Sequence, residues 1–528
     1  MRSKCMWQLP LIVTSAMFMT VGGATDWGDL RLPPEHVPYF FRNNPHMKQR
    51  CQDEDTCPYK SSLEVRRCWG YEDRCPVGER MSTPRCTEDG SQKPRRGEHS
   101  AEEKNTETFW RQADFGYVKE RKTNLRIYCT PQAQGDSSLE CVDGLRYCHA
   151  TNLYIDLRTA HVKQQGKSYR KDVLKSGQIG GHCRLDRASL LAQRDNTGFL
   201  SSWYFEMEPF TSLTSRPLES GKCDVIIDKP TFIIKLDAGG NMFHHFCDFV
   251  NLYISQHLNN SFTTDVNVFI WDTARAYMEL FGETWNAFTD HPRLMLVDLE
   301  GKRVCFKEAI FSFLARMSHG LFYAIRPVEN CYNSGLMRAF SQHILHRLGI
   351  HQHGPLARKL RVTFMSRNTR YRKIRNIAKL ESALKNNADL DVKVVDYNRN
   401  IPFPDQLKIS YNTDILIGIH GAGLTHLLFL PDWAVVFEIY NCEDPSCYPN
   451  LARLRGIKYM TWEHADKLKT INVDDAYKGG AKAKFVDYEF DPYETLRLVR
   501  KAADHVTSHH AFVKDGELNS KHIHKNEL

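Results

Sequence analysis

The sequence lacks several features that would define other classes of protein. Its longest apolar run near the start, Leu11 to Met19, is shorter than the about 20 residues that a membrane-spanning helix needs. We find no second candidate span, no nucleic-acid-binding motif and no internal repeat period. The basic residues behind the net charge of +8 are scattered rather than clustered. These absences argue against a membrane span, a nucleic-acid partner and a repeat architecture.

The Cys-rich early part of the chain also lacks a Cys-x-x-Cys pair, which is the usual start of a zinc site. Zinc is therefore the weaker interpretation of that cluster, and disulfides the stronger one. The cluster consists of Cys51, Cys57, Cys68, Cys75 and Cys86, and Cys129, Cys141 and Cys148 follow it. Cys442 and Cys447 form a further close pair. Without Cys5, which lies in the predicted signal peptide, 15 of the 16 cysteines remain. An odd number leaves one thiol unpaired or bonded to another molecule, and we predict that Cys247 is unpaired.

Both ends of the chain predict its destination. A basic start, an apolar stretch and small residues before position 25 indicate a secretory signal peptide over residues 1–24, with a type II membrane anchor as the alternative. The last four residues differ by one from a Lys-Asp-Glu-Leu retrieval signal: Lys525, Asn526, Glu527 and Leu528. Asn259 begins an N-glycosylation sequon. We therefore expect the lumen of the endoplasmic reticulum and a retrieval receptor as partner.

The remaining chain is long enough for about three domain-sized units. Residues 25–225 are polar, Cys-rich and irregular in pattern. Residues 226–345 and 346–505 each alternate strand-like and helix-like segments, and 506–528 form a tail. Strands alternating with helices predict parallel, doubly wound sheets. The predicted fold class is therefore α/β: a GT-B-like pair of Rossmann-type domains after a disulfide-rich N-terminal region, an architecture that suits a nucleotide-sugar transferase.

The expected elements follow from runs of apolar residues. Strands are predicted at 231–236, 266–271, 294–297, 360–365, 392–395, 415–417 and 435–438, and helices at 242–254, 337–348, 377–385 and 496–505.

A glycine-rich turn follows the apolar run that ends at Ile417. Strand, glycine turn and helix start together present backbone N–H groups to phosphate. The expected phosphate-binding residues are Gly418, His420, Gly421, Ala422 and Gly423. His426 is the other histidine beside this turn, and we predict that His420 is the one that contacts the ligand. The alternative is a tight turn that binds nothing.

Two neighbouring strand ends carry further polar groups. Arg367 follows the strand at 360–365, and its planar guanidinium suits a diphosphate. Glu438 ends another strand, where a carboxylate can hold the hydroxyls of a ribose. The alternatives are a solvated basic loop and a structural glutamate.

The first half offers a candidate general base. His244 and Asp248 stand four residues apart on a predicted helix and share one face. Transfer of a group to a hydroxyl needs such a base. A capped helix N-terminus and a metal-binding pair are the alternatives, although no third metal ligand is apparent.

Several long stretches resemble the family-61 glycosyltransferases. They are residues 284–290, 302–309, 418–433, 438–444, 451–456 and 502–506. The resemblance implies an inverting enzyme that moves N-acetylglucosamine from UDP-N-acetylglucosamine to Ser or Thr of secreted proteins. The implied acceptors are folded EGF-like modules, as on Notch-type receptors. A family-61 transferase with another acceptor, such as O-mannosyl glycans, and a non-catalytic lumenal chaperone or lectin are the alternatives.

One segment departs from the family pattern. Where the family carries a short acidic motif linked to activity, this chain reads Asp290, His291 and Pro292. A manganese ion bound there would have one carboxylate, or His291 as a substitute ligand. The need for a divalent cation is therefore left open.

Overall fold

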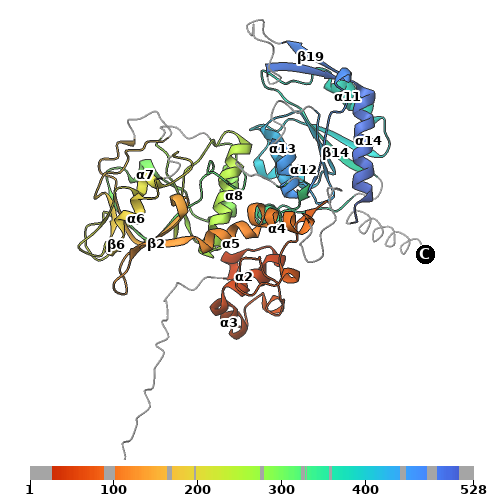
Figure 1. Ribbon diagram of the computed structural model, residues 1–528. Coiled ribbons are helices and arrows are strands. Elements are labelled where there is room, and N and C mark those ends of the chain that lie inside the picture. The colour runs from red at the N-terminus through yellow and green to blue at the C-terminus, as the bar shows by residue number, and fades with distance from the viewer. Residues whose placement is uncertain are drawn as a thin grey trace, which may run out of the picture.

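The computed structural model describes residues 27–87, 101–162, 169–194, 198–273, 279–322, 328, 330–355, 359–439, 447–472 and 485–510. The predicted signal peptide, the retrieval tail and Cys442 lie outside these ranges. Two large sheets, two two-stranded sheets and a small N-terminal helical part make up the described chain (Figure 1). The predicted fold class, two Rossmann-type α/β halves with a disulfide-rich N-terminal region, is confirmed.

Short helices form the N-terminal part. They are α1 (Trp27–Leu30), α2 (Val37–Asn43) and α3 (Pro45–Asp53), followed by α4 (Ala101–Ala113) and α5 (Phe115–Thr123). Asp114, between the last two, accepts hydrogen bonds from the backbone N–H groups of Gly335 and Leu336. It thereby satisfies the free N-terminus of α10 (Gly335–Arg347) from a distant part of the chain.

The first sheet is mixed. Its order is β11 (Leu294–Met295), β10 (Asn267–Ile270), β9 (Thr231–Ile234), β12 (Arg303–Phe311), β4 (Cys148–Asp156), β3 (Ser138–Val142), β2 (Leu125–Thr130) and β6 (Arg184–Leu185). Short strands β5 (Ile179–Gly181), β7 (Phe210–Ser212) and β8 (Val225–Ile227) join it. The strands from β9 to β11 are parallel, whereas β4 pairs with β12 in antiparallel fashion.

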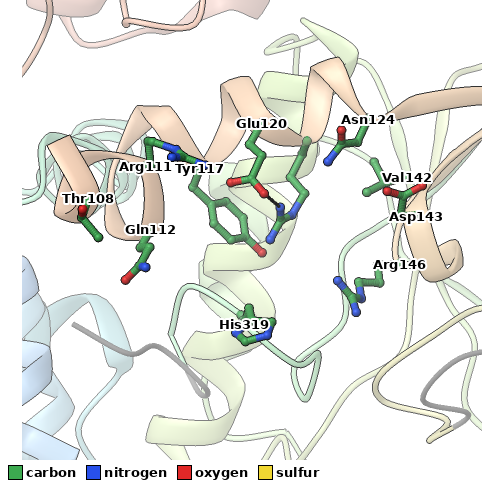
Figure 2. Close-up of a pocket in the computed structure, with 12 residues that line it drawn as sticks. Thr108, Arg111, Gln112, Tyr117, Glu120, Asn124, Val142, Asp143, Arg146 and His319 are labelled. Atoms are coloured by element: carbon green, nitrogen blue, oxygen red, sulfur yellow. Dashed lines mark hydrogen bonds and ion pairs between the residues drawn. The ribbon is translucent and has the colours of Figure 1, made fainter. Parts of the chain in front are cut away.

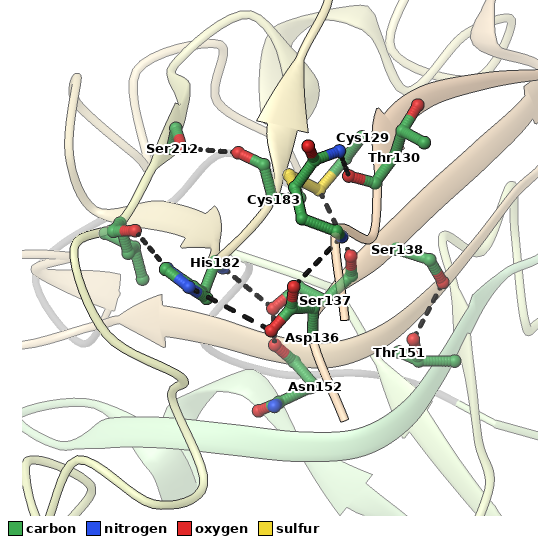
Figure 3. Close-up of a disulfide and its surroundings, with 12 residues drawn as sticks. Cys129, Thr130, Asp136, Ser137, Ser138, Thr151, Asn152, His182, Cys183 and Ser212 are labelled. Carbon is green, nitrogen blue, oxygen red and sulfur yellow. Dashed lines mark hydrogen bonds and ion pairs between the residues drawn. A yellow bond between two sulfur atoms is a disulfide. The ribbon is translucent and has the colours of Figure 1, made fainter. Parts of the chain in front are cut away.

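The N-terminal region is therefore less irregular than expected. Strands β2 to β4 extend the sheet of the first half across the predicted boundary near residue 225, because β4 fills the edge that β12 would otherwise expose. Figure 3 shows the disulfide between Cys129 and Cys183, which fastens β2 to β6. Beside it, the Ser137 hydroxyl donates to the Asn152 carbonyl over 2.7 Å.

Six disulfides join the described cysteines: Cys51–Cys57, Cys68–Cys75, Cys86–Cys331, Cys129–Cys183, Cys141–Cys148 and Cys223–Cys305. The prediction that the early cluster forms disulfides rather than a zinc site is confirmed, because each of its cysteines takes part in one of these bonds. Cys247 is buried on α8 (Met242–Asn259) and carries a free thiol, as predicted.

The second sheet is wholly parallel, in the order β15 (Leu390–Val395), β14 (Leu360–Met365), β16 (Ile415–Gly418), β17 (Val435–Glu438) and β18 (Lys458–Thr461). Helices α11 (Ile377–Lys385), α12 (Phe403–Tyr411), α13 (Cys447–Arg455) and α14 (Pro492–Ser508) accompany it, with a hairpin of β19 (Leu468–Asn472) and β20 (Val486–Phe490). Every residue of β16 and β17 is buried, which explains their continuous apolar runs.

The predicted elements differ from the observed ones in a few places. The strand expected at 294–297 ends at Met295, where α9 (Leu296–Leu299) begins. The helix expected at 242–254 continues to Asn259, since nearly all of α8 is buried between the two sheets (Figure 1). The stretch after the glycine turn forms a 3-10 helix, η7 (Ala422–Phe429), rather than an α-helix.

The two halves share one apolar core. Phe246 on α8 packs against Phe403 and Phe429 of the second half, with ring centroids 5.6 and 5.4 Å apart. This packing fixes the carboxyl ends of the two sheets relative to each other. Within the described residues, no helix has both the length and the hydropathy to cross a membrane.

Candidate active site

A small cavity of about 130 Å³ lies at the carboxyl ends of β14, β15 and β16. Arg367, Tyr397, Gly421 and Gly423 are among its lining residues. Ligands of parallel α/β sheets bind at this edge. The structure therefore brings the glycine turn and the Arg367 strand end together, as the sequence predicted.

Two glycines allow the turn to approach the neighbouring strand end. A Cβ atom on Gly418 would lie 2.4 Å from Met365 Cε, and one on Gly421 would lie 2.4 Å from Arg367 Nη1. Gly423 is less confined, with Met365 Sδ 3.7 Å from the same position. Glycine at 421 thus leaves space for the guanidinium beside the turn and does not serve an unusual backbone angle.

Two arginines give this turn a positive field. Arg367 Nε donates to Thr369 Oγ1 over 2.6 Å and to the Tyr371 carbonyl over 3.1 Å. Burial and the neighbouring Arg372 lower the pKa of Arg367 to about 10. Arg372 donates to the His420 carbonyl over 2.8 Å. Two cations held close together in a partly buried turn are stabilised by a bound anion.

His420 is oriented by a buried carboxylate. Its Nδ1 lies 2.7 Å from Glu438 Oε1, and the Tyr459 hydroxyl donates to Glu438 Oε2 over 2.6 Å. Glu438 is completely buried. The expected contact of Glu438 with a ribose is therefore corrected: both of its oxygens are engaged within the protein, and its role is to position His420.

His426 has a structural environment. Its ring nitrogens lie 2.9 Å from Ser410 Oγ and 3.2 Å from Gln406 Oε1, and its ring packs 4.3 Å from that of Tyr397. Burial lowers the pKa of His426 to about 3, so this histidine is neutral. His420 lies between two residues that line the cavity, Ile419 and Gly421, and its contact with a ligand stays a prediction.

The first half presents His244 at the start of α8. Its Nδ1 lies 2.8 Å from Asp237 Oδ2, and Arg316 holds the other oxygen of that carboxylate through Nη2 at 2.9 Å. Burial raises the pKa of Asp237, but the bonds with His244 and Arg316 outweigh it and leave the pKa below its usual range. An ionised Asp237 makes Nδ1 the donor and leaves the lone pair of His244 on Nε2.

The expected pairing of His244 with Asp248 is corrected. Asp248 is buried and accepts from the backbone N–H of Asp237 over 3.1 Å, while His245 Nδ1 lies 3.3 Å from its carboxylate. Burial raises the pKa of Asp248 to about 6. Both side chains lie toward Asp237, but His244 at the start of α8 reaches its carboxylate, whereas Asp248, one turn further along the helix, is buried against its backbone N–H. Asp248 thus supports the backbone that carries Asp237.

Tyr448 on α13 connects the two groups. Its ring centroid lies 5.2 Å from that of His420 and 5.8 Å from that of Phe243, the residue before His244. The candidate phosphate site and the candidate base therefore face one common region between the halves.

The segment at Asp290 lies elsewhere. Asp290 pairs with Arg31 over 2.5 Å, and His291 Nε2 lies 2.6 Å from Asp265 Oδ1. Asp265 precedes β10, so this cluster is at the amino edge of the parallel strands, opposite His244. A metal ion at residues 290–292 would not reach the anion site, and these residues do not fit a manganese ion that assists the diphosphate.

Other possible metal ligands also lie apart from the site. Among the described residues, three or more such groups meet at Cys68, Glu72 and Cys75 and at Glu463, His464 and Glu494. The first set contains a disulfide, and the second is ion-paired with Arg497.

The sequon residue Asn259 ends α8 and donates to Glu308 Oε1 over 3.3 Å.

Sequence reasoning missed Asp237, Arg316, Tyr448 and Tyr459. Asp237 follows the strand at 231–236, so the strand-end rule that singled out Arg367 applies to it equally. The other three reach the site only through tertiary packing and carry no local signal.

Comparison with known proteins shows the family to which this chain belongs. The family model described as glycosyltransferase 61 matches residues 227–437, which include His244, Arg367 and the glycine turn. This protein is therefore a glycosyltransferase with two Rossmann-type halves, a class whose donor is a nucleotide sugar.

Similar whole-length relatives are known in several animals. An EGF domain-specific O-linked N-acetylglucosamine transferase of Gallus gallus is 50% identical over 491 residues, covering 91% of this chain and 90% of the relative. Proteins of the same name are 49% identical over 487 residues in Rattus norvegicus (92% and 91% covered) and 45% identical over 506 residues in Drosophila melanogaster (94% of each). The chain belongs to this family of transferases within glycosyltransferase 61.

Proposed function

We propose that this protein transfers N-acetylglucosamine from UDP-N-acetylglucosamine to Ser or Thr of folded EGF-like domains, with inversion at the sugar carbon. The names of its relatives support the sugar and the acceptor. The observation that carries the proposal is the placement of an arginine-lined anion site and a His–Asp pair on either side of Tyr448.

His244 acts as the general base in this mechanism. Asp237 holds Nδ1, so Nε2 takes the proton of the acceptor hydroxyl while the hydroxyl oxygen attacks the sugar carbon. The bond from that carbon to the diphosphate breaks at the same time, and UDP departs. His244 replaces Asp248 in this role because Asp248 is buried.

The leaving group collects negative charge, and stabilising that charge is the largest demand on the site. Arg367 and the backbone of the glycine turn meet the diphosphate, with His420 held by Glu438 beside them. The arginines supply positive charge there without a divalent cation, and we expect activity without added manganese.

The proposed location is the lumen of the endoplasmic reticulum. The signal-peptide pattern, the retrieval-like tail and the six disulfides support it, since such bonds persist in oxidising compartments. Notch-type receptors and other EGF-containing secreted proteins are the proposed partners, with a retrieval receptor for the tail.

A transfer assay tests the proposal. Purified protein is incubated with UDP-N-acetylglucosamine and a folded EGF-like module, with and without manganese, beside a reduced module and an O-mannosyl glycopeptide. Transfer to the folded module alone is expected. Transfer to the glycopeptide instead would favour the other acceptor class, and binding of the module without UDP-sugar binding or transfer would favour the non-catalytic chaperone or lectin.

Donor binding is tested separately by calorimetry with UDP. Arg367→Ala should weaken UDP binding by about tenfold or more, because a charge-assisted contact to phosphate is lost. Arg500→Ala, an exposed change on α14, should leave UDP binding unaltered. Equal affinities for both variants would remove Arg367 from the donor site.

A further inference from the structure

A second, larger cavity of about 440 Å³ lies on the first half (Figure 2). Helices α4 and α5 form one side, and the turn at residues 143–146 and the loop at His319–Gly320 form the other. Figure 2 shows the Tyr117 ring pointing toward His319, with Arg146 to one side. Neither the donor site nor the base uses this cavity.

The loop that borders the cavity also borders the candidate base. Arg316 holds Asp237, the partner of His244, and the ring centroid of Phe322 lies 5.0 Å from that of Phe243. His319 stands three residues from each of them, and three residues span at most about 10 Å. The loop at residues 316–322 therefore connects the cavity with the surroundings of the candidate base.

The cavity carries an excess of positive charge. Its two carboxylates are neutralised, since Glu120 pairs with Arg121 over 3.2 Å and Asp143 pairs with Arg126 over 3.3 Å. Arg111 and Arg146 make no ion pair with any residue that the structure describes, although Arg146 donates to Ser318 over 3.4 Å. Arg111 and His319 are exposed. An occupant with a carboxylate would meet unpaired cations here.

Buried side chains form the floor of the cavity. Tyr117 is 2% exposed, and the Arg121 guanidinium lies 4.3 Å from the centre of its ring. The volume exceeds that of a single small anion and accommodates a short stretch of polypeptide.

We propose that this cavity is a subsite for the acceptor protein, and that it takes an acidic side chain next to the modified Ser or Thr. This inference rests on the proposed function, because it assumes a protein acceptor. The subsite holds the acceptor polypeptide on the side of His244, while the donor binds across Tyr448.

Binding and transfer are measured separately for Arg111→Glu and Arg146→Glu. Binding of the folded EGF-like module is followed by surface plasmon resonance, transfer by the acceptor KM and kcat, and donor binding by calorimetry with UDP. We expect each variant to bind the module about tenfold more weakly and to show a raised acceptor KM. UDP affinity should be unchanged, and Arg500→Glu should behave as wild type.

Charge exchange identifies the occupant. An acceptor whose acidic residue beside the modified site is replaced by Lys should bind wild type weakly and recover binding to Arg146→Glu. Unchanged module binding in both arginine variants, or lost binding without recovery, overturns the subsite. If wild type binds the module through these arginines but transfers no sugar, the proposed function fails and the subsite stands.

Discussion

At the scale of single residues, neighbouring carboxylates in this protein have different roles because their surroundings differ. Asp237 is bonded to His244 and Arg316 and stays ionised. Asp248, eleven residues on, is buried, and burial raises its pKa to about 6. The ionised Asp237 can orient the imidazole of His244, whereas the buried Asp248 holds the backbone N–H of Asp237.

Replacing His244 tests this division. We expect His244→Gln to lower kcat by about 10²–10⁴-fold, the range for loss of a general base, with UDP affinity unchanged. Asp248→Asn should reduce kcat by a smaller factor, because it acts through Asp237. Steady-state kinetics with the folded acceptor measure both, and His464→Gln on the surface is the control. Full activity of His244→Gln would exclude this base.

His149 on β4 is a second charged residue with a defined effect. Burial lowers its pKa, but bonds to Glu140 and Glu308, each 3.1 Å long, outweigh this and raise the pKa to about 9. A raised pKa means that the folded state binds the proton more tightly than the unfolded state. The resulting stability is complete below about pH 6.5 and is lost as pH rises through about 9.

The size of that effect is on the order of 2 kcal/mol, allowing for partial exposure of the side chain. Denaturant unfolding at pH 6, 7.5 and 9.5 measures it. His149→Gln should flatten the decline of unfolding free energy over this range. An unchanged decline in the variant would assign the pH dependence to other groups.

At the scale of elements, the turn between β16 and η7 is shaped by the strand end beside it. Gly421 has a φ of 161°, which is extended backbone open to any residue. Its lack of a side chain matters because Arg367 Nη1 occupies the space a Cβ would need. The turn and the arginine are therefore one unit formed by two elements.

Gly421→Ala tests that unit. We expect the methyl group to displace Arg367 and weaken UDP binding by about tenfold, with little change in unfolding free energy. Gly423→Ala is the matched control, because its Cβ meets only an ordinary contact with Met365. Calorimetry with UDP and thermal unfolding measure the two effects. Equal UDP affinity for the two variants would show that the turn tolerates a side chain at 421.

At the scale of the whole molecule, the N-terminal part is fastened to the catalytic halves. The Cys86–Cys331 disulfide joins residues 245 apart in sequence, and Asp114 caps α10. Aromatic packing of α8 against Phe403 joins the two halves. The site between the halves thus depends on contacts distant in sequence.

Removing disulfides in pairs tests this dependence. The chain-entropy model gives about 5 kcal/mol for Cys86–Cys331 and about 2 kcal/mol for Cys51–Cys57, the first an upper bound since other disulfides shorten its loop. Cys86→Ala with Cys331→Ala should therefore lower the denaturation midpoint more than Cys51→Ala with Cys57→Ala. The opposite order would indicate that the short N-terminal loop carries the greater part of the stabilisation.

Much of the second half was predictable from sequence. Strands β14, β16 and β17 and helix α11 were predicted within a residue, because buried parallel strands are apolar runs that end at glycine or polar residues. The N-terminal strands were missed because disulfides and edge pairing, rather than long apolar runs, stabilise them. The His244–Asp248 pair was wrong because helical spacing does not tell that Asp248, one turn further along the same face, is buried against the Asp237 backbone.

The sequence by itself determined the parallel sheet of the second half, the glycine turn, the Arg367 strand end and the resemblance to family-61 glycosyltransferases, since these depend on residues close together in the chain. Only the tertiary structure decided that Asp237 holds His244, that Glu438 is occupied by His420 and Tyr459, and that Asp290 lies at the opposite edge of its sheet. Hydrogen bonds and burial join residues that are distant in sequence, and no local pattern encodes them.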